Sequence, residues 1–183
     1  KDLKMKMVKV LVIVMSVSFL FGCVSSPYNS TPKNEDSVKQ KISYRYDEFK
    51  KVAWLETEEY LGEIENGWNA GVTHHYRAQF NEKGDLNFIQ LYMILMSNEW
   101  YFIGDIRDSN GSAYNFVKID RDVVSGGGIH EHFAIIITKD QLLDFSKVDK
   151  RFKVLGKKNS GVFNVSKHLS SAFLKRLNQQ ESN

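Results

Sequence analysis

The feature that most constrains the fold is a segment that is apolar on both sides of an extended chain. Over residues 86–97, one side carries Phe88, Tyr92, Ile94 and Met96, and the other carries Ile89, Leu91, Met93 and Leu95. Such a strand needs cover on both faces, which a central position in a sheet provides. The segment is therefore predicted to be the central strand of a β-sheet.

Shorter segments around it alternate with the period of a strand. Residues 72–80 place five side chains on one face, namely Val72, His74, Tyr76, Ala78 and Phe80. Further strands are expected at residues 129–137, 152–155 and 161–165, whereas residues 50–55 fit a strand or a short helix. Asn110-Gly111 lies between apolar residues 99–105 and 113–120, which predicts a hairpin.

Two helices are expected late in the chain. Thr138 and Gln141 have the spacing of a capping box, which predicts a short helix through Phe145. Ser166 can cap a final helix, whose apolar stripe is Leu169, Ala172, Phe173 and Leu177. The predicted fold class is mainly β or α+β: an antiparallel sheet or sandwich of about seven to eight strands with both helices packed on it.

The N-terminal segment has the layout of a secretory signal rather than of a folded element. Lys1, Lys4, Lys6 and Lys9 precede an uncharged, mostly apolar run over residues 10–21. The run is too short for a membrane-spanning helix, which needs roughly 20 apolar residues. We therefore expect residues 1–22 to be a leader that is removed.

The end of that run, Leu20-Phe21-Gly22-Cys23, resembles the lipobox of bacterial lipoproteins. The resemblance implies cleavage after Gly22, a diacylglycerol thioether on Cys23 and an N-acyl chain, which together hold the protein on membrane lipid. Val24 in place of Asp implies the periplasmic face of the outer membrane in a Gram-negative host. Because Cys23 is the single cysteine, no intramolecular disulfide is possible.

These features predict four regions: a leader (1–22), a lipidated cysteine with a disordered tether (23–41), one globular β-rich domain (42–178) and a flexible tail (179–183). The tether contains both prolines of the chain and many polar residues. Removal of the leader takes away four lysines and one aspartate, so 21 basic residues balance 21 acidic residues. This balance disfavours nucleic acid as a partner.

Scattered residues of the domain are similar to a group of uncharacterised bacterial lipoproteins. They are residues 46–54, Gln90-Leu91-Tyr92, residues 99–102, Asp120-Arg121-Asp122 and Glu131-His132-Phe133. That group has no known activity, so the resemblance implies no catalytic residues.

His130-Glu131-His132 is the strongest candidate for chemistry. Residues two apart on a strand point the same way, so His130 and His132 can present two imidazoles to one divalent metal ion. His74 or His75 is a candidate third ligand, and a carboxylate is a candidate fourth. In the alternative interpretation the histidines face solvent, and Glu131 faces the core in an ion pair with Arg121 or Arg77.

Other catalytic patterns are absent from the sequence. No Gly-x-Ser-x-Gly elbow occurs, and a domain without cysteine excludes thiol catalysis. The leading hypothesis is a non-enzymatic envelope module that binds an envelope protein or supports an assembly. The second is a metal-binding protein or metal-dependent hydrolase that uses the His-x-His strand. The third is a small-ligand carrier with a pocket between sheet and helix.

Overall fold

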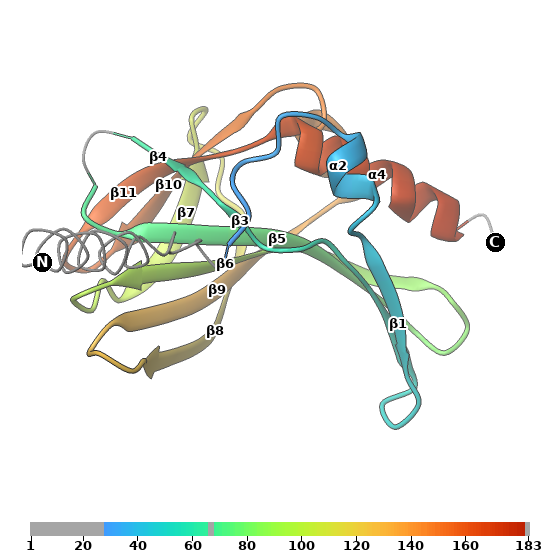
Figure 1. The fold of residues 1–183 in the computed structure, drawn as a ribbon, viewed down its shortest axis with the longest axis horizontal. Coiled ribbons are helices and arrows are strands. Elements are labelled where there is room, and N and C mark those ends of the chain that lie inside the picture. Colours follow the sequence, from blue (N-terminus) through green and yellow to red (C-terminus); the bar gives the residue numbers. More distant parts are fainter. Residues whose placement is uncertain (1–27, 66–67, 182–183) are drawn as a thin grey trace, which may run out of the picture.

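The computed structural model describes residues 28–65 and 68–181, which form two antiparallel sheets and three helices (Figure 1). The larger sheet runs in the order β1 (Ser43–Asp47), β2 (Val52–Glu56), β5 (Gly71–Phe80), β6 (Leu86–Ser97), β9 (Ile129–Ile137) and β8 (Asn115–Val123), and β3 (Tyr60–Leu61) pairs with β5. The smaller sheet runs in the order β4 (Glu63–Ile64), β11 (Ser160–Val165), β10 (Lys150–Gly156) and β7 (Ile103–Asp108). The helices are α2 (Asp36–Lys39), α3 (Lys139–Phe145) and α4 (Lys167–Glu181).

The predicted fold class is confirmed. The structure is mainly antiparallel β, with a short helix and a C-terminal helix. The strand count exceeds the prediction because β1, β3 and β4 are short and their residues lack a clear apolar alternation. The segment predicted as a strand or short helix at residues 50–55 is strand β2.

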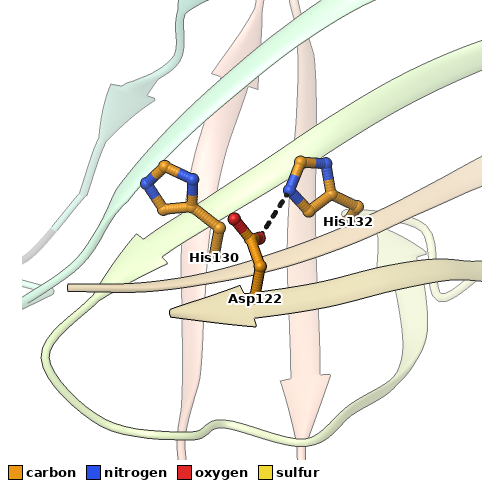
Figure 2. Close-up of side chains that lie close together, drawn as sticks. All are labelled: Asp122, His130 and His132. Carbon is orange, nitrogen blue, oxygen red and sulfur yellow. Dashed lines mark hydrogen bonds and ion pairs between the residues drawn. The ribbon is translucent and has the colours of Figure 1, made fainter. Parts of the chain in front are cut away.

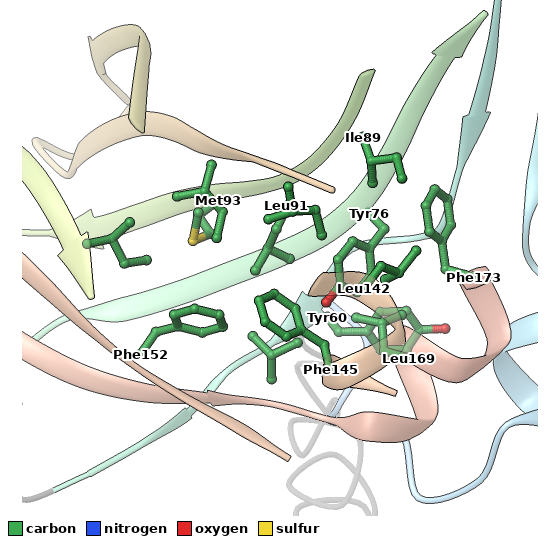
Figure 3. Close-up of a cluster of buried hydrophobic side chains, with 14 of the residues drawn as sticks. Tyr60, Tyr76, Ile89, Leu91, Met93, Leu142, Phe145, Phe152, Leu169 and Phe173 are labelled. Carbon is green, nitrogen blue, oxygen red and sulfur yellow. The ribbon is translucent and has the colours of Figure 1, made fainter. Parts of the chain in front are cut away.

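One hydrophobic core lies between the inner face of the larger sheet and a second layer made of the smaller sheet, α3 and α4 (Figures 1 and 3). Leu91 and Met93 of the larger sheet face Phe152, Phe145 and Phe173 of the second layer, and all five are buried. Burial of each such side chain contributes about 1.5–3 kcal/mol to folding. Because one face of the larger sheet packs against this core, the opposite face is the outer face of the sheet.

β6 occupies the centre of the larger sheet, as predicted, with β5 on one side and β9 on the other. Its inward side chains, including Leu91 and Leu95, are fully buried. Its outward side chains Tyr92, Ile94 and Met96 are half-buried. β6 therefore has a core face and a second apolar face on the outside of the sheet.

The hairpin predicted around Asn110-Gly111 forms only at its tip, where one antiparallel bridge joins Arg107 to Ala113. A turn is present, because Asp108 Oδ1 accepts hydrogen bonds from the backbone N–H groups of Asn110 and Ser112 at 2.9 and 3.0 Å. However, β7 pairs with β10 in the smaller sheet and β8 pairs with β9 in the larger sheet. The turn residues predict where the chain reverses direction, whereas contacts between distant segments determine which strands pair.

The two predicted helix starts are confirmed. Thr138 Oγ1 accepts a hydrogen bond from the Gln141 backbone N–H at 3.1 Å, and Gln141 Oε1 accepts one from the Thr138 backbone N–H at 2.8 Å. Ser166 Oγ accepts from the His168 backbone N–H at 3.2 Å at the start of α4. Both caps satisfy backbone donors that have no partner inside the helix.

Residues 28–41, part of the predicted disordered tether (23–41), pack against the domain instead. The Ser166 hydroxyl donates a hydrogen bond to the Pro32 carbonyl at 3.0 Å, and Val38 of α2 is fully buried. α2 lies beside α4 (Figure 1). The composition of this segment predicts disorder because it contains few apolar residues. The partners that stabilise the segment lie more than a hundred residues later, where local composition cannot show them.

The leader and the lipidation site lie outside the described residues. This concerns residues 1–22 and Cys23, together with the following residues through 27. Among the helices that the structure does describe, none has the length and apolar character needed to cross a bilayer. At the other end α4 continues to Glu181, so residues 179–181 of the predicted flexible tail are helical.

Candidate functional site

The candidate site lies on the hairpin formed by β8 and β9. Two hydrogen bonds close its turn: the Val124 N–H donates to the Gly128 carbonyl at 2.8 Å, and the Gly127 N–H donates to the Val124 carbonyl at 3.0 Å. Gly126 and Gly127 have φ angles of 92° and 84°. Residues with a Cβ rarely adopt this left-handed region, so the glycines permit the tight return.

Three successive pairs across this hairpin join an acidic residue to a basic one: Asp120 with His132, Arg121 with Glu131, and Asp122 with His130. The middle pair faces the core and the outer two face away from it, because side chains alternate along a strand. Complementary pairs of this kind favour one register of the two strands.

A β-bulge in β8 sets which of these side chains point outward. The register shifts between Lys118 and Asp120, which leaves Ile119 as the extra residue. One extra residue reverses the facing of every residue that follows it. Val117 is paired with Ala134, which faces outward, so Val117 faces outward too. If the side chains alternated without a bulge after Val117, Asp120 would face the core. The bulge instead places Asp120 and, two residues later, Asp122 on the face that carries the histidines.

The side chains of Asp122, His130 and His132 converge on this outer face (Figure 2). Asp122 Oδ1 lies 3.1 Å from His132 Nε2, and the His130 and His132 ring centroids are 6.1 Å apart. One carboxylate oxygen and one ring nitrogen from each histidine lie within 4.8 Å of one another. The three residues therefore bring two nitrogen donors and one oxygen donor to a common point.

This donor set could hold a transition-metal ion. Metal–nitrogen and metal–oxygen bonds of about 2.0–2.2 Å place neighbouring ligand atoms about 3.3 Å apart, so atoms that now lie within 4.8 Å of one another would move closer on binding. The Asp122 side chain is 47% exposed and the His132 side chain is 19% exposed, which leaves access from solvent. Three protein ligands leave a fourth position for water or another ligand.

Tyr92 orients one of the two imidazoles. Its hydroxyl lies 2.8 Å from His132 Nδ1, on the side of the ring opposite to Asp122. Burial raises the pKa of Tyr92, so the hydroxyl keeps its proton. A phenol both donates and accepts, so it can also accept the Nδ1 proton when Nε2 binds a metal. Ligating histidines commonly have such a partner on the second nitrogen.

Directly behind the histidines, Glu131 faces the core and is nearly buried. Its carboxylate accepts three backbone N–H bonds, from Tyr101 at 2.6 Å, Phe102 at 2.8 Å and Ile103 at 3.0 Å. Arg121 Nε lies 3.1 Å from the second oxygen, so the predicted ion pair with Arg121 is present. This carboxylate joins β9 to the segment that enters β7, and we assign it a structural role.

The structure does not bring His74 to the cluster. His74 lies on the core face of β5, fully buried, with its ring centroid 5.9 Å from that of Phe163. Within the described residues neither ring nitrogen has a hydrogen-bond partner, and burial lowers the pKa of His74 to about 3. The predicted third ligand therefore points to the opposite side of the sheet, because His74 and His130 occupy different faces in the observed register.

His75, the other candidate third ligand, lies on the outer face but outside the cluster. Its ring stacks on Tyr92 with centroids 4.9 Å apart. Burial, followed by the charge of Arg77, lowers the pKa of His75 to about 4, so the ring is neutral. His75 thus packs beside the residue that orients His132, and Asp122 is the residue that lies with the two histidines in the cluster.

Sequence reasoning missed Asp122 and Tyr92 as members of the site. The signal for Asp122 is the match between Asp120-Arg121-Asp122 and His130-Glu131-His132, which alternate acid and base in opposite order. That match predicts the pairing of the strands once both are placed in one hairpin. Tyr92 carries no comparable signal, because its side chain reaches His132 from a strand on the other side of β9.

Comparisons of this chain with protein-family models, with curated proteins and with solved structures found no match.

Proposed function

We propose that this protein is lipid-anchored in the cell envelope and binds a divalent transition-metal ion through Asp122, His130 and His132. The observation that supports metal binding is the convergence of two imidazoles and one carboxylate, whose ligand atoms lie within 4.8 Å of one another. The anchor is proposed from the resemblance of residues 20–23 to a lipobox.

The surroundings of the cluster support binding of a metal more than a simple ion pair. An ion pair needs only Asp122 and one histidine, and His132 already supplies that partner at 3.1 Å. His130 adds a second nitrogen donor beside the same carboxylate. A divalent cation satisfies all three donors at once, and the remaining coordination position suits a bound water. A metal with such an open position can activate water for hydrolysis.

The test of metal binding compares Zn²⁺ titrations of the whole chain, purified in detergent. We expect the wild-type protein to bind one equivalent of Zn²⁺. In His130→Ala/His132→Ala the affinity falls roughly a hundredfold or more, because two of three ligands are gone. His168→Ala is the matched control, since His168 lies on α4 outside the cluster. Equal Zn²⁺ binding by the double variant and the control contradicts the site.

The test of anchoring uses Cys23→Ser. We expect the parent protein to incorporate labelled fatty acid and to fractionate with membranes, because two or three acyl chains hold a protein firmly on a bilayer. The Cys23→Ser protein loses the label and leaves the membrane fraction. An unlabelled parent that behaves like the variant contradicts the anchor and leaves the metal proposal standing.

A further inference from the structure

We infer that the same centre binds copper as Cu(I), with the thioether of Met96 as an additional ligand. This inference rests on the proposed metal-binding function and adds to the divalent ion a second, monovalent ion, Cu(I), that the same two imidazoles can hold. It starts from the register of β6 and β9, which places Met96 directly opposite His130. Directly opposed residues point to the same face and have Cβ atoms about 4.5–5.5 Å apart.

Met96 and His130 also border a common space. Both line a hollow of about 410 Å³ at the ends of β5, β6 and β9. His130 therefore lies between a carboxylate on β8 and a thioether on β6. Ile94, which is opposite His132, offers no donor atom. The residue with the soft donor thus lies on the His130 side of the cluster.

On the side of Met96 away from β9, strand β5 has a glycine, so no side chain of β5 stands opposite Met96. Gly71 pairs with Met96, and a Cβ added at Gly71 would stand 3.0 Å from Met96 Cε. The methyl group thus lies over Gly71 in this structure. Methionine has three rotatable side-chain bonds, so binding turns the thioether from Gly71 toward His130.

A thioether beside the two imidazoles adds affinity for a soft metal ion. Thioether sulfur is a soft ligand that favours Cu(I), whereas imidazole serves zinc, copper and nickel alike. Residues 28–181 contain two methionines and no cysteine. Met93, the other methionine, is fully buried on the core face of β6. Met96 is therefore the soft donor that the described domain presents beside the histidines.

The experiment measures Cu(I) and Zn²⁺ affinities of the whole chain without oxygen, with a chromophoric chelator as competitor. The variants are Met96→Leu and, as the matched control, Met93→Leu. We expect Met96→Leu to weaken Cu(I) binding roughly tenfold or more and to leave Zn²⁺ affinity nearly unchanged, because only the soft ligand is lost. X-ray absorption of the Cu(I)-loaded wild type shows a copper–sulfur shell, which Met96→Leu lacks.

The outcomes separate this inference from the function on which it rests. If the wild type binds Zn²⁺ through the histidines but Met96→Leu binds Cu(I) as tightly as Met93→Leu, the copper inference is wrong and metal binding stands. If the wild type binds neither ion, both proposals are wrong. A selective loss of Cu(I) binding in Met96→Leu supports both.

Discussion

The two faces of the β8–β9 hairpin each carry a carboxylate beside basic side chains, and they use these groups differently. On the core face, the Glu131 carboxylate accepts bonds from three backbone N–H groups and from Arg121. On the outer face, the Asp122 carboxylate lies between His130 and His132 and bonds to His132 alone among the contacts described. The Glu131 carboxylate has its hydrogen-bonding capacity filled. The Asp122 carboxylate lies beside two imidazoles and bonds to one of them.

This difference separates a structural from a functional use of charge. A buried carboxylate is stable only if its hydrogen-bonding capacity is filled, and removing it leaves several donors unsatisfied. A partly exposed cluster gains less folding energy from its contacts, because water screens them. The same alternation that sends Glu131 inward therefore produces an outer face whose ligands are available for another partner.

Glu131→Gln is expected to have the largest effect on stability. The substitution leaves Arg121 without its carboxylate and sets an amide NH₂ against backbone donors, which costs about 3 kcal/mol. Urea denaturation of the wild type and the variant measures the loss.

Arg121→Lys is the control for Glu131→Gln, because it keeps a positive charge beside the carboxylate and should cost less. If Glu131→Gln lowers the free energy of unfolding by under 1 kcal/mol, the three backbone bonds do not hold the two sheets together, and the contrast between the two faces of the β8–β9 hairpin is lost.

The next largest effect is expected from the protonation of His74 as the pH falls, which lowers the stability of the fold. Its pKa is about 3 in the folded protein against 6.5 for an ordinary histidine, because burial disfavours the charged ring. The unfolded chain therefore binds a proton that the folded chain does not. This histidine contributes its full stability above pH 6.5 and loses it as the pH falls toward 3. Between pH 6 and 4.5 the loss is about 2 kcal/mol.

His74→Leu tests this prediction because leucine fills the same buried position and does not titrate. Urea denaturation at pH 6.0 and pH 4.5 should show a smaller drop in the free energy of unfolding for the variant than for the wild type. Equal drops in the two proteins mean that His74 is accessible to protons in the folded state, contrary to its burial.

The sequence predicts the parts of this molecule that depend on local patterns and fails where distant segments decide. The alternation of residues 72–80 and the apolar faces of residues 86–97 predict strands and their facing, which the structure confirms. The Thr138 capping box depends on four neighbouring residues and is also confirmed.

The candidate site shows the same division. The strand period correctly predicts that His130 and His132 share a face. It cannot predict the bulge at Ile119, which arises from how β8 pairs with β9 and brings Asp122 to that face. The expectation for His74 is wrong for a related reason: two separate strands have no common facing until their register is known.

Tyr92→Phe is expected to reduce metal affinity roughly tenfold, or about 1.4 kcal/mol, because His132 loses the group that holds its ring. Phenylalanine keeps the ring that stacks on His75, so the fold is retained. Tyr114→Phe is the matched control, since it removes a tyrosine hydroxyl that bonds Asp108 at 2.9 Å, away from the cluster. Equal Zn²⁺ affinities of the two variants would falsify an orienting role for Tyr92.

Asp122→Asn is expected to have the smallest effect on the fold and is the outer-face counterpart of Glu131→Gln. The same exchange of carboxylate for amide should change the free energy of unfolding by no more than about 0.5 kcal/mol, because the Asp122 side chain is 47% exposed. Added Zn²⁺ should raise the melting temperature of the wild type more than that of the variant, since ligand binding to the folded state alone stabilises it. If Asp122→Asn destabilises the metal-free protein as much as Glu131→Gln does, the outer carboxylate is also structural and the metal-site assignment loses its basis.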